Sequence, residues 1–143
     1  MNVTDHTPRP ACPACSTGTL VREVRGSRFE YRGETLSYEQ PGDWCTECGE
    51  ALLSGEDMAA TETLIVDFMR RVDRTQADEL SRIRRKLKLT QKQAAALTGG
   101  GHNAFSRYER GEAKPLPAVM HLFRLLGQHP ELLDELRKED KTA

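Results

Sequence analysis

The chain has 143 residues, which suits one ordinary domain or two small ones. Hydrophobic residues make up 37% and charged residues 30%, a balance typical of a soluble globular protein. No apolar run approaches the ~18 residues that a bilayer-spanning helix needs. The first thirty residues hold no apolar signal-peptide core, so we expect a cytoplasmic protein with no membrane association.

The net charge of -1 conceals an uneven distribution along the chain. Residues 1–77 carry eight basic and thirteen acidic side chains, whereas residues 78–143 carry thirteen basic and nine acidic ones. The basic half is suited to a polyanion, while the acidic half would repel one and is better suited to a protein partner. Two parts with two tasks are therefore expected.

Alternating apolar and polar residues, with turn residues between them, predict a small β-rich region in the first third of the chain. The region lies between two pairs of cysteines. The strands are expected at 19–24, 29–31 and 36–38, and the turns at 32–34 and 41–43.

From about residue 57 to 74 the apolar side chains recur with the period of a helix, as Phe68 and Val72 illustrate. A short linker is expected near 73–77. This linker sets the boundary between an N-terminal domain, residues 1–75, and a C-terminal domain, residues 76–143.

The C-terminal domain is expected to be all helical. Thr90 and Gln93 form a T-x-x-Q capping box, which marks a helix start, and Gly99–Gly101 ends that helix. Five helices are expected. The first contains Leu80, Ile83 and Leu87, the second begins at Thr90, and the third covers 103–110. The fourth begins at Pro117 and the fifth near Pro130.

All four cysteines belong to two C-x2-C pairs separated by 29 residues: Cys12 with Cys15, and Cys45 with Cys48. A C-x2-C turn places two sulfurs on one side of a tight loop, so two such turns supply the four ligands of a tetrahedral metal. We expect one zinc ion per chain. Its role would be structural, because four protein ligands leave no position for a reacting water and the sheet is too small to fold on its own core.

Three alternatives remain open for the cysteines. Iron uses the same four-thiolate shell in rubredoxin-like sites. A thiol–disulfide redox pair is disfavoured because no βαβ pattern flanks either C-x2-C. Four inert buried cysteines are the third alternative. The four histidines lie outside the cluster.

Two short helices around the glycine-rich turn, preceded by an apolar helix, are typical of a helix-turn-helix domain, whose last helix enters the major groove of DNA. The eleven residues from Arg82 to Lys92 contain six basic side chains and no acid. Such a run is typical of a phosphate-contacting surface, although a solvated helix face is the alternative. Contacts to DNA phosphates are further expected from Thr90, Gln91 and Lys92 at the start of the second helix.

Base contacts are expected from the helix over 103–110. Asn103 and Arg107 are four residues apart and share a face; Asn can bind the edge of adenine in a bidentate manner, and Arg that of guanine. Ser106 is a further candidate for a base or phosphate. Asn103 has the alternative of capping the helix. Phe105 and Tyr108 lie on another face and are expected in the core.

These residues resemble the MqsA (YgiT-type) antitoxin family. The resemblance covers residues 12 to about 137, with GGGHNAFSRYERG at 99–111 after LTQK at 89–92, and PELL at 130–133. It implies an α+β two-domain fold, in which a small β-rich four-cysteine zinc domain precedes an all-α, Xre/Cro-like helix-turn-helix domain. The family's base-reading Asn and Arg fall on Asn103 and Arg107, and its zinc ligands fall on the four cysteines.

The resemblance also implies a function. Such antitoxins of type II toxin–antitoxin systems bind a toxin ribonuclease through the zinc domain and operator DNA through a C-terminal homodimer, repressing their own operon. The alternative is a free-standing helix-turn-helix regulator whose zinc ribbon is structural or senses metal or redox state. An enzyme is not expected, because a closed four-cysteine site has no catalytic position and no Ser/His/Asp or paired-carboxylate set stands out.

Overall fold

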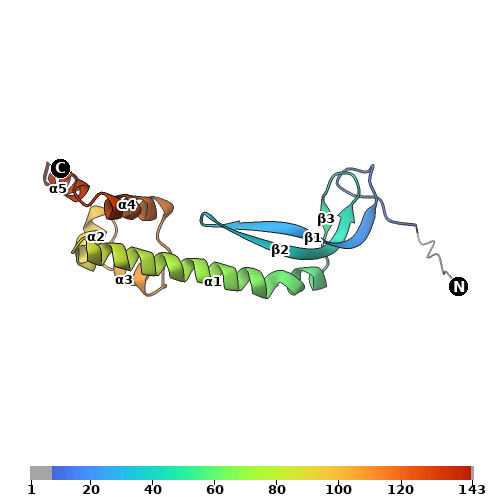
Figure 1. Ribbon diagram of the computed structural model, residues 1–143, viewed down its shortest axis with the longest axis horizontal. Coiled ribbons are helices and arrows are strands. Elements are labelled where there is room, and N and C mark those ends of the chain that lie inside the picture. The colour runs from blue at the N-terminus through green and yellow to red at the C-terminus, as the bar shows by residue number, and fades with distance from the viewer. Residues whose placement is uncertain (1–7, 143) are drawn as a thin grey trace. The chain divides into compact units, whose positions relative to one another are not determined.

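A computed structural model describes residues 8–142 of the chain. A small antiparallel sheet comes first and helices follow, as the α+β expectation requires (Figure 1). The contacts divide the chain into two compact units, Met1–Phe68 and Met69–Ala143, which are described separately below. Within the described residues, no helix combines the length and the apolarity that crossing a bilayer demands.

The first unit is built on a long β-hairpin. Strand β1 (Leu20–Tyr31) pairs antiparallel with β2 (Glu34–Cys45), and β2 pairs with the short β3 (Ala51–Leu52). The hairpin turn is the dipeptide Arg32-Gly33, whose φ values of 51° and 86° are both positive. Two positive φ values match the twist of the flanking strands, which explains the tight reversal.

The strands differ from the expected ones in two ways. The strands predicted at 19–24 and 29–31 join into the single strand β1. The turn predicted at 41–43 is wrong, because Pro41 and Gly42 lie inside β2 and pair with Val24 and Glu23. β3 pairs with β2 only beyond Pro41, so the missing N–H of this proline can be tolerated at a strand edge.

Helix α1 runs without interruption over 32 residues, Gly55–Lys86. The linker expected near 73–77 is therefore wrong at the level of secondary structure, because this stretch is helical. Neither glycine nor proline occurs in it, and the buried positions continue through Gln76, which is 6% exposed, and Ala77. The buried amide of Gln76 replaces the apolar residue that the helical pattern would need there.

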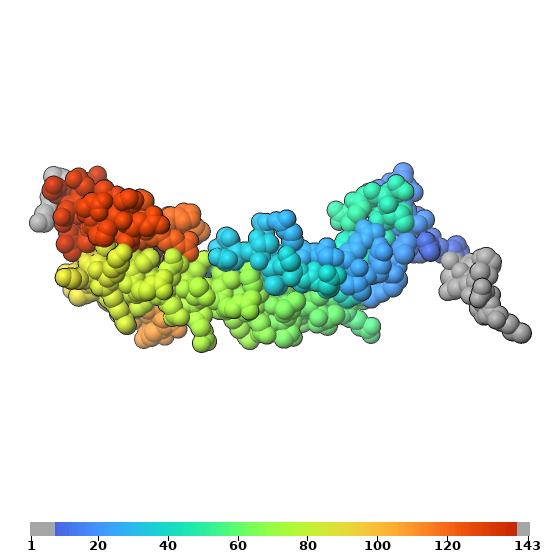
Figure 2. All heavy atoms as spheres, in the orientation of Figure 1, coloured from blue at the N-terminus to red at the C-terminus, as the bar shows by residue number. Residues whose placement is uncertain are grey.

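In the first unit, the hairpin lies along the first part of α1, and side chains fill the space between them (Figures 1 and 2). Phe29 of β1 meets Phe68 of α1 edge-on, with ring centroids 6.3 Å apart. The buried Gln40 donates to the carbonyl oxygen of Asp57 and accepts from the hydroxyl of Thr61. Arg22 completes the junction by donating to the carboxylate of Asp57.

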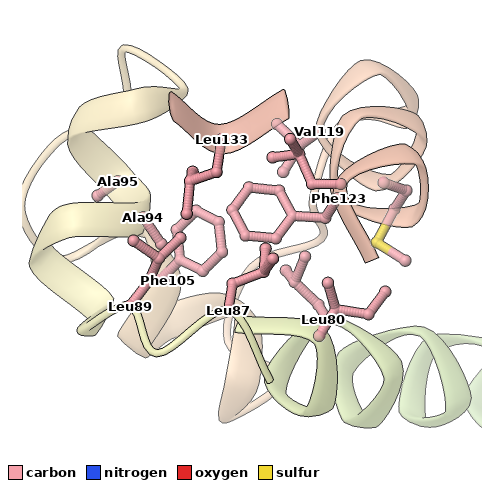
Figure 3. Close-up of a cluster of buried hydrophobic side chains, with 12 residues drawn as sticks. Leu80, Leu87, Leu89, Ala94, Ala95, Phe105, Val119, Phe123 and Leu133 are labelled. Carbon is pink, nitrogen blue, oxygen red and sulfur yellow. The ribbon is translucent and has the colours of Figure 1, made fainter. Parts of the chain in front are cut away.

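The second unit contains the end of α1 and the remaining helices around one apolar core. Phe105 and Phe123 lie at its centre, with centroids 4.9 Å apart and no exposed surface (Figure 3). The capping box predicted at Thr90 is confirmed by hydrogen bonds in both directions between Thr90 and Gln93. The helices are α2 (Gln91–Leu97), α3 (Ala104–Glu109), α4 (Pro117–Gln128) and α5 (Leu132–Thr142).

Candidate metal centre and nucleic-acid interface

The two C-x2-C turns lie at one end of the hairpin. Cys12 and Cys15 occupy the loop before β1, whereas Cys45 ends β2 and Cys48 lies in the turn that follows. Backbone hydrogen bonds fix each loop: Cys12 donates to the Gly18 carbonyl at 2.9 Å, and Cys45 donates to the Glu50 carbonyl at 2.8 Å. The loops are also joined to each other, since the backbone N–H of Thr46 donates to the carbonyl of Thr19.

The four sulfurs match a tetrahedral metal shell. The Sγ atoms of Cys12 and Cys48 are 3.7 Å apart, those of Cys15 and Cys45 are 3.6 Å apart, and all four lie within 4.8 Å of one another. A zinc ion with Zn–S bonds of about 2.3 Å has sulfur–sulfur edges of about 3.8 Å. All four cysteines are free thiols, so no disulfide competes for these sulfurs. The cysteines are thus positioned for zinc, as the spacing predicted.

Backbone N–H groups surround two of the sulfurs. Gly18 donates to Sγ of Cys15, and both Glu47 and Cys48 donate to Sγ of Cys45. Such donors stabilise thiolates, the form that binds metal. Gly18 also has a steric role that sequence reasoning missed, because a Cβ atom there would collide with Sγ of Cys45. The signal was a glycine three residues after a C-x2-C turn.

The thiol pKa values of Cys15 and Cys48 move in opposite directions, because the hydrogen bonds and neighbouring thiols of these two residues differ. Hydrogen bonds from the Thr17 side chain and from backbone N–H groups lower the pKa of Cys15 to about 6. For Cys48, a backbone hydrogen bond at Glu50 lowers the pKa, but desolvation by the surrounding loop and the neighbouring thiols outweigh it and raise the pKa to about 12. Four adjacent thiolates repel one another, and a divalent cation would relieve that repulsion.

In the second unit, α2 and α3 are separated by residues 98–103, where Gly99 has a φ of 69°. Phe105 holds α3 in the core and contacts Tyr108 edge-on at 5.6 Å, which confirms the core role expected for these aromatics. The other side of α3 remains at the surface. Exposed side chains there include Asn103 and Arg107, and Ser106 is half-buried.

Asn103 and Arg107 are placed one helical turn apart, with the N–H of Arg107 donating to the carbonyl of Asn103 at 3.0 Å. The Asn103 side chain makes no capping hydrogen bond, so the geometry gives no support to the capping alternative. Within residues 8–142, neither side chain has a recorded hydrogen bond or ion pair. Both polar heads are available to a partner.

Not all of the basic run from Arg82 to Lys92 is available, which corrects the sequence interpretation. Arg84 is bound to the carboxylate of Glu109, and the ammonium of Lys86 donates to the carbonyl of Gly127 at 2.7 Å. These two cations tie α1 to α3 and α4. In the part of the chain that the structure describes, the basic side chains of the run that are exposed without such hydrogen bonds are Arg82, Arg85, Lys88 and Lys92.

Glu109 also organises one of the expected phosphate contacts. Its Oε2 accepts a 2.6 Å hydrogen bond from Nε2 of Gln91, so this amide is oriented against α3. The Thr90 hydroxyl oxygen accepts from the Gln93 N–H, and Lys92 is exposed. The structure therefore brings the start of α2 next to the end of α3. Glu109 was missed by sequence reasoning because its partners are distant in the chain.

These features define a two-part protein that joins a four-cysteine metal-binding sheet to a helical unit with an exposed polar face on α3. Residues 10–137 match the model of a family described as the antitoxin component of the bacterial toxin–antitoxin system, MqsA. Antitoxin MqsA of Escherichia coli (strain K12) is 40% identical over 129 residues, which cover 88% of this chain and 98% of the relative. The chain belongs to the MqsA antitoxin family.

Proposed function

We propose that this antitoxin neutralises a toxin ribonuclease through its zinc-binding sheet and represses its own operon through its helical unit. The observation that carries the DNA-binding part of the proposal is the pair formed by Asn103, directly before α3, and Arg107 on α3: both are exposed and have no partner within the described residues. The chain binds its operator in the cytoplasm and acts as a regulator without enzymatic activity.

DNA binding uses α2 and α3 as an Xre-like helix-turn-helix, with α3 in the major groove. Asn103 pairs with the edge of adenine and Arg107 with that of guanine, while Ser106 contacts a base or a phosphate. The ammonium group of Lys92 contacts a phosphate of the DNA backbone. Thr90 and Gln91 hold the start of α2 against the DNA backbone. The Gln91 amide is already oriented by its hydrogen bond to Glu109.

The protein binds its operator as a homodimer, because one such unit reads about half a site. Leu116 and Leu125 support an interface in the C-terminal part, since their side chains are 66% and 49% exposed. Such apolar surface is expected to be covered by a second copy. Sedimentation showing only monomer at micromolar concentration would contradict the dimer.

The toxin partner is assigned to the first part of the chain. Residues 1–77 carry eight basic and thirteen acidic side chains, a balance that favours a basic protein over nucleic acid. One structural zinc per chain holds this part in shape, because its four cysteine ligands leave no open position for chemistry.

The decisive experiment expresses the tagged full-length chain at native level and identifies co-purifying protein by mass spectrometry and DNA by sequencing. A small basic protein that arrests growth when expressed alone, together with DNA from upstream of the antitoxin gene, is the expected result. Recovery of the DNA without any toxin would overturn the antitoxin assignment and leave a free-standing regulator. Recovery of the toxin alone would overturn the repressor assignment.

A further inference from the structure

The turn between α1 and α2 holds a lysine in a conformation that favours glycine. Lys88 has a φ of 57°, in the left-handed region. The N–H of Leu89 donates to the carbonyl of Arg84 at 3.1 Å, and the N–H of Lys88 donates to that of Arg85 at 3.0 Å. This pair of bonds is a Schellman motif, in which Lys88 occupies the position where glycine avoids the steric penalty of Cβ.

The neighbouring leucines fix this conformation. Leu87 and Leu89 are 8% and 3% exposed and point into the core, where Figure 3 labels both. The backbone between these two buried leucines must therefore turn at one residue, Lys88. The side chain of Lys88, by contrast, is exposed and has no recorded hydrogen bond or ion pair in the described part of the chain. The fold therefore requires the turn, but no recorded contact of the fold requires a lysine there.

Lys88 also lies close to the proposed DNA-binding surface. It precedes Gln91 by three residues, which span at most about 10 Å of chain. Gln91 in turn contacts Glu109 at the end of α3, with 2.6 Å between Nε2 and Oε2. No acidic residue occurs from Ser81 to Tyr108, and the charge of Glu109 is already paired with Arg84. The positive charge of Lys88 is thus not compensated along this stretch.

We propose that Lys88 binds a phosphate of the DNA backbone, and that this contact explains a lysine at a glycine-favouring position. A non-glycine side chain held in a strained backbone conformation, with no contact in the fold that accounts for it, is typical of functional sites. The inference rests on the proposed DNA-binding function and adds a contact to it. The competing explanation is that the ammonium stabilises the C-terminal end of the α1 dipole, which would leave DNA binding unaffected by its loss.

Lys88→Gly separates these explanations because stability and DNA affinity should change in opposite directions. Binding to a mixed-sequence DNA duplex is measured by fluorescence anisotropy over a range of NaCl concentrations, and the melting temperature of the zinc-loaded chain by calorimetry. Lys88→Gly is expected to melt at a higher temperature and to bind more weakly. The slope of log K against log salt should become shallower by about 0.9 per bound protomer. Lys88→Arg should retain the wild-type slope.

Arg32→Gly is the matched control. Arg32 has a φ of 51° in the hairpin turn, so its replacement removes the same charge at the same kind of position in the other unit. The slope and the affinity should remain those of the wild type. Lys88→Asn, which also tolerates the left-handed conformation, should weaken binding in the same way if Lys88→Gly fails to fold.

The possible outcomes distinguish failure of the Lys88 phosphate contact from failure of the proposed DNA-binding function. A Lys88→Gly variant with wild-type affinity and salt slope overturns the phosphate contact, and the proposed function stands if Arg107→Ala still loses operator preference. Weaker binding by Arg32→Gly to the same extent would also overturn it, since the effect would then be one of net charge. A wild-type chain that binds no duplex overturns both proposals.

Discussion

Arg84 and Glu109 form an ion pair of two hydrogen bonds that joins the end of α1 to the end of α3. Nε of Arg84 lies 2.5 Å from Oε1, and Nη2 lies 3.1 Å from Oε2. The two side chains are only 11% and 9% exposed. Arg84 also donates to the carbonyl of Leu89, and Glu109 also accepts from Gln91, so one pair connects three helices. The position of α3 thus depends on a carboxylate that accepts from two helices.

Arg84→Met should therefore destabilise the helical unit strongly. The substitution leaves Glu109 buried without its cation, which costs about 3–5 kcal/mol of unfolding free energy. Urea denaturation of the zinc-loaded chain measures this loss. Arg110→Met is the control, because the Arg110–Glu112 pair is 60% and 50% exposed and should contribute less than about 1 kcal/mol. Equal losses from the two variants would contradict the role assigned to the buried pair.

The same pair predicts a loss of stability in acid. Burial acts to raise the pKa of Glu109, but hydrogen bonds from Arg84 and Gln91 outweigh it and hold the pKa below its ordinary value. A carboxyl group with a depressed folded-state pKa stabilises the fold above its unfolded pKa of about 4.3, and this contribution is lost as pH falls through the folded value. The hydrogen bond from Arg124 lowers the pKa of Glu79 and adds to the effect.

The melting temperature of the helical unit should accordingly fall as the pH falls below about 4.3. Glu109→Gln should flatten this part of the profile, because its side chain cannot ionise. Glu112→Gln, at an exposed ion pair, should leave the profile unchanged. A Glu109→Gln profile with the wild-type acid slope would show that other carboxylates control the transition.

Local patterns predicted the features that depend on nearby residues. The C-x2-C spacing alone brings two sulfurs together, and the hairpin then only has to return the chain to its starting end. The capping box at Thr90 was equally predictable, because both of its hydrogen bonds join residues three apart. The aromatic core position of Phe105 followed from helical periodicity.

Features that depend on distant partners could not be predicted in this way. Gln76 lies at a buried position of α1, so a count of apolar residues breaks there and suggested a linker. Arg84 looked like one more cation of a phosphate-binding run, because its acceptor Glu109 is 25 residues away. The strand around Pro41 looked like a turn, since the sequence does not reveal which edge of a strand is left unpaired.

Arg107→Ala should weaken operator binding by about 1–3 kcal/mol and relax specificity at one base pair, because a bidentate contact to guanine would be lost. Competition between the operator and single-site variants of it, at one fixed salt concentration, measures both effects. Arg28→Ala serves as the control, since this exposed arginine lies on the hairpin. Unchanged operator affinity in Arg107→Ala would refute the base-reading role.

Zinc removal should unfold the sheet and leave the helical core intact. The sheet has a small buried cluster around Cys12, Leu20 and Cys45, whereas the helical unit has its own apolar core. Metal binding therefore contributes to the folding of the first unit alone. NMR spectra recorded with EDTA should lose the dispersed signals of residues 12–50 and keep those of the helical core, and added zinc should restore them. Simultaneous loss of both sets would contradict this independence.

Gly18→Ala should weaken zinc binding while all four ligands remain in place. An added Cβ would collide with Sγ of Cys45 and would lie 3.0 Å from Cβ of Glu47, so the two C-x2-C loops must move apart. Changes beside the ligands of a metal site typically cost about 10–100-fold in affinity. Competition with a chromophoric zinc chelator measures the loss. Gly55→Ala is the matched control, because nothing lies within 4 Å of a Cβ at Gly55 and no strain follows. If both variants bound zinc like the wild type, the sulfurs would not require the close approach that Gly18 permits.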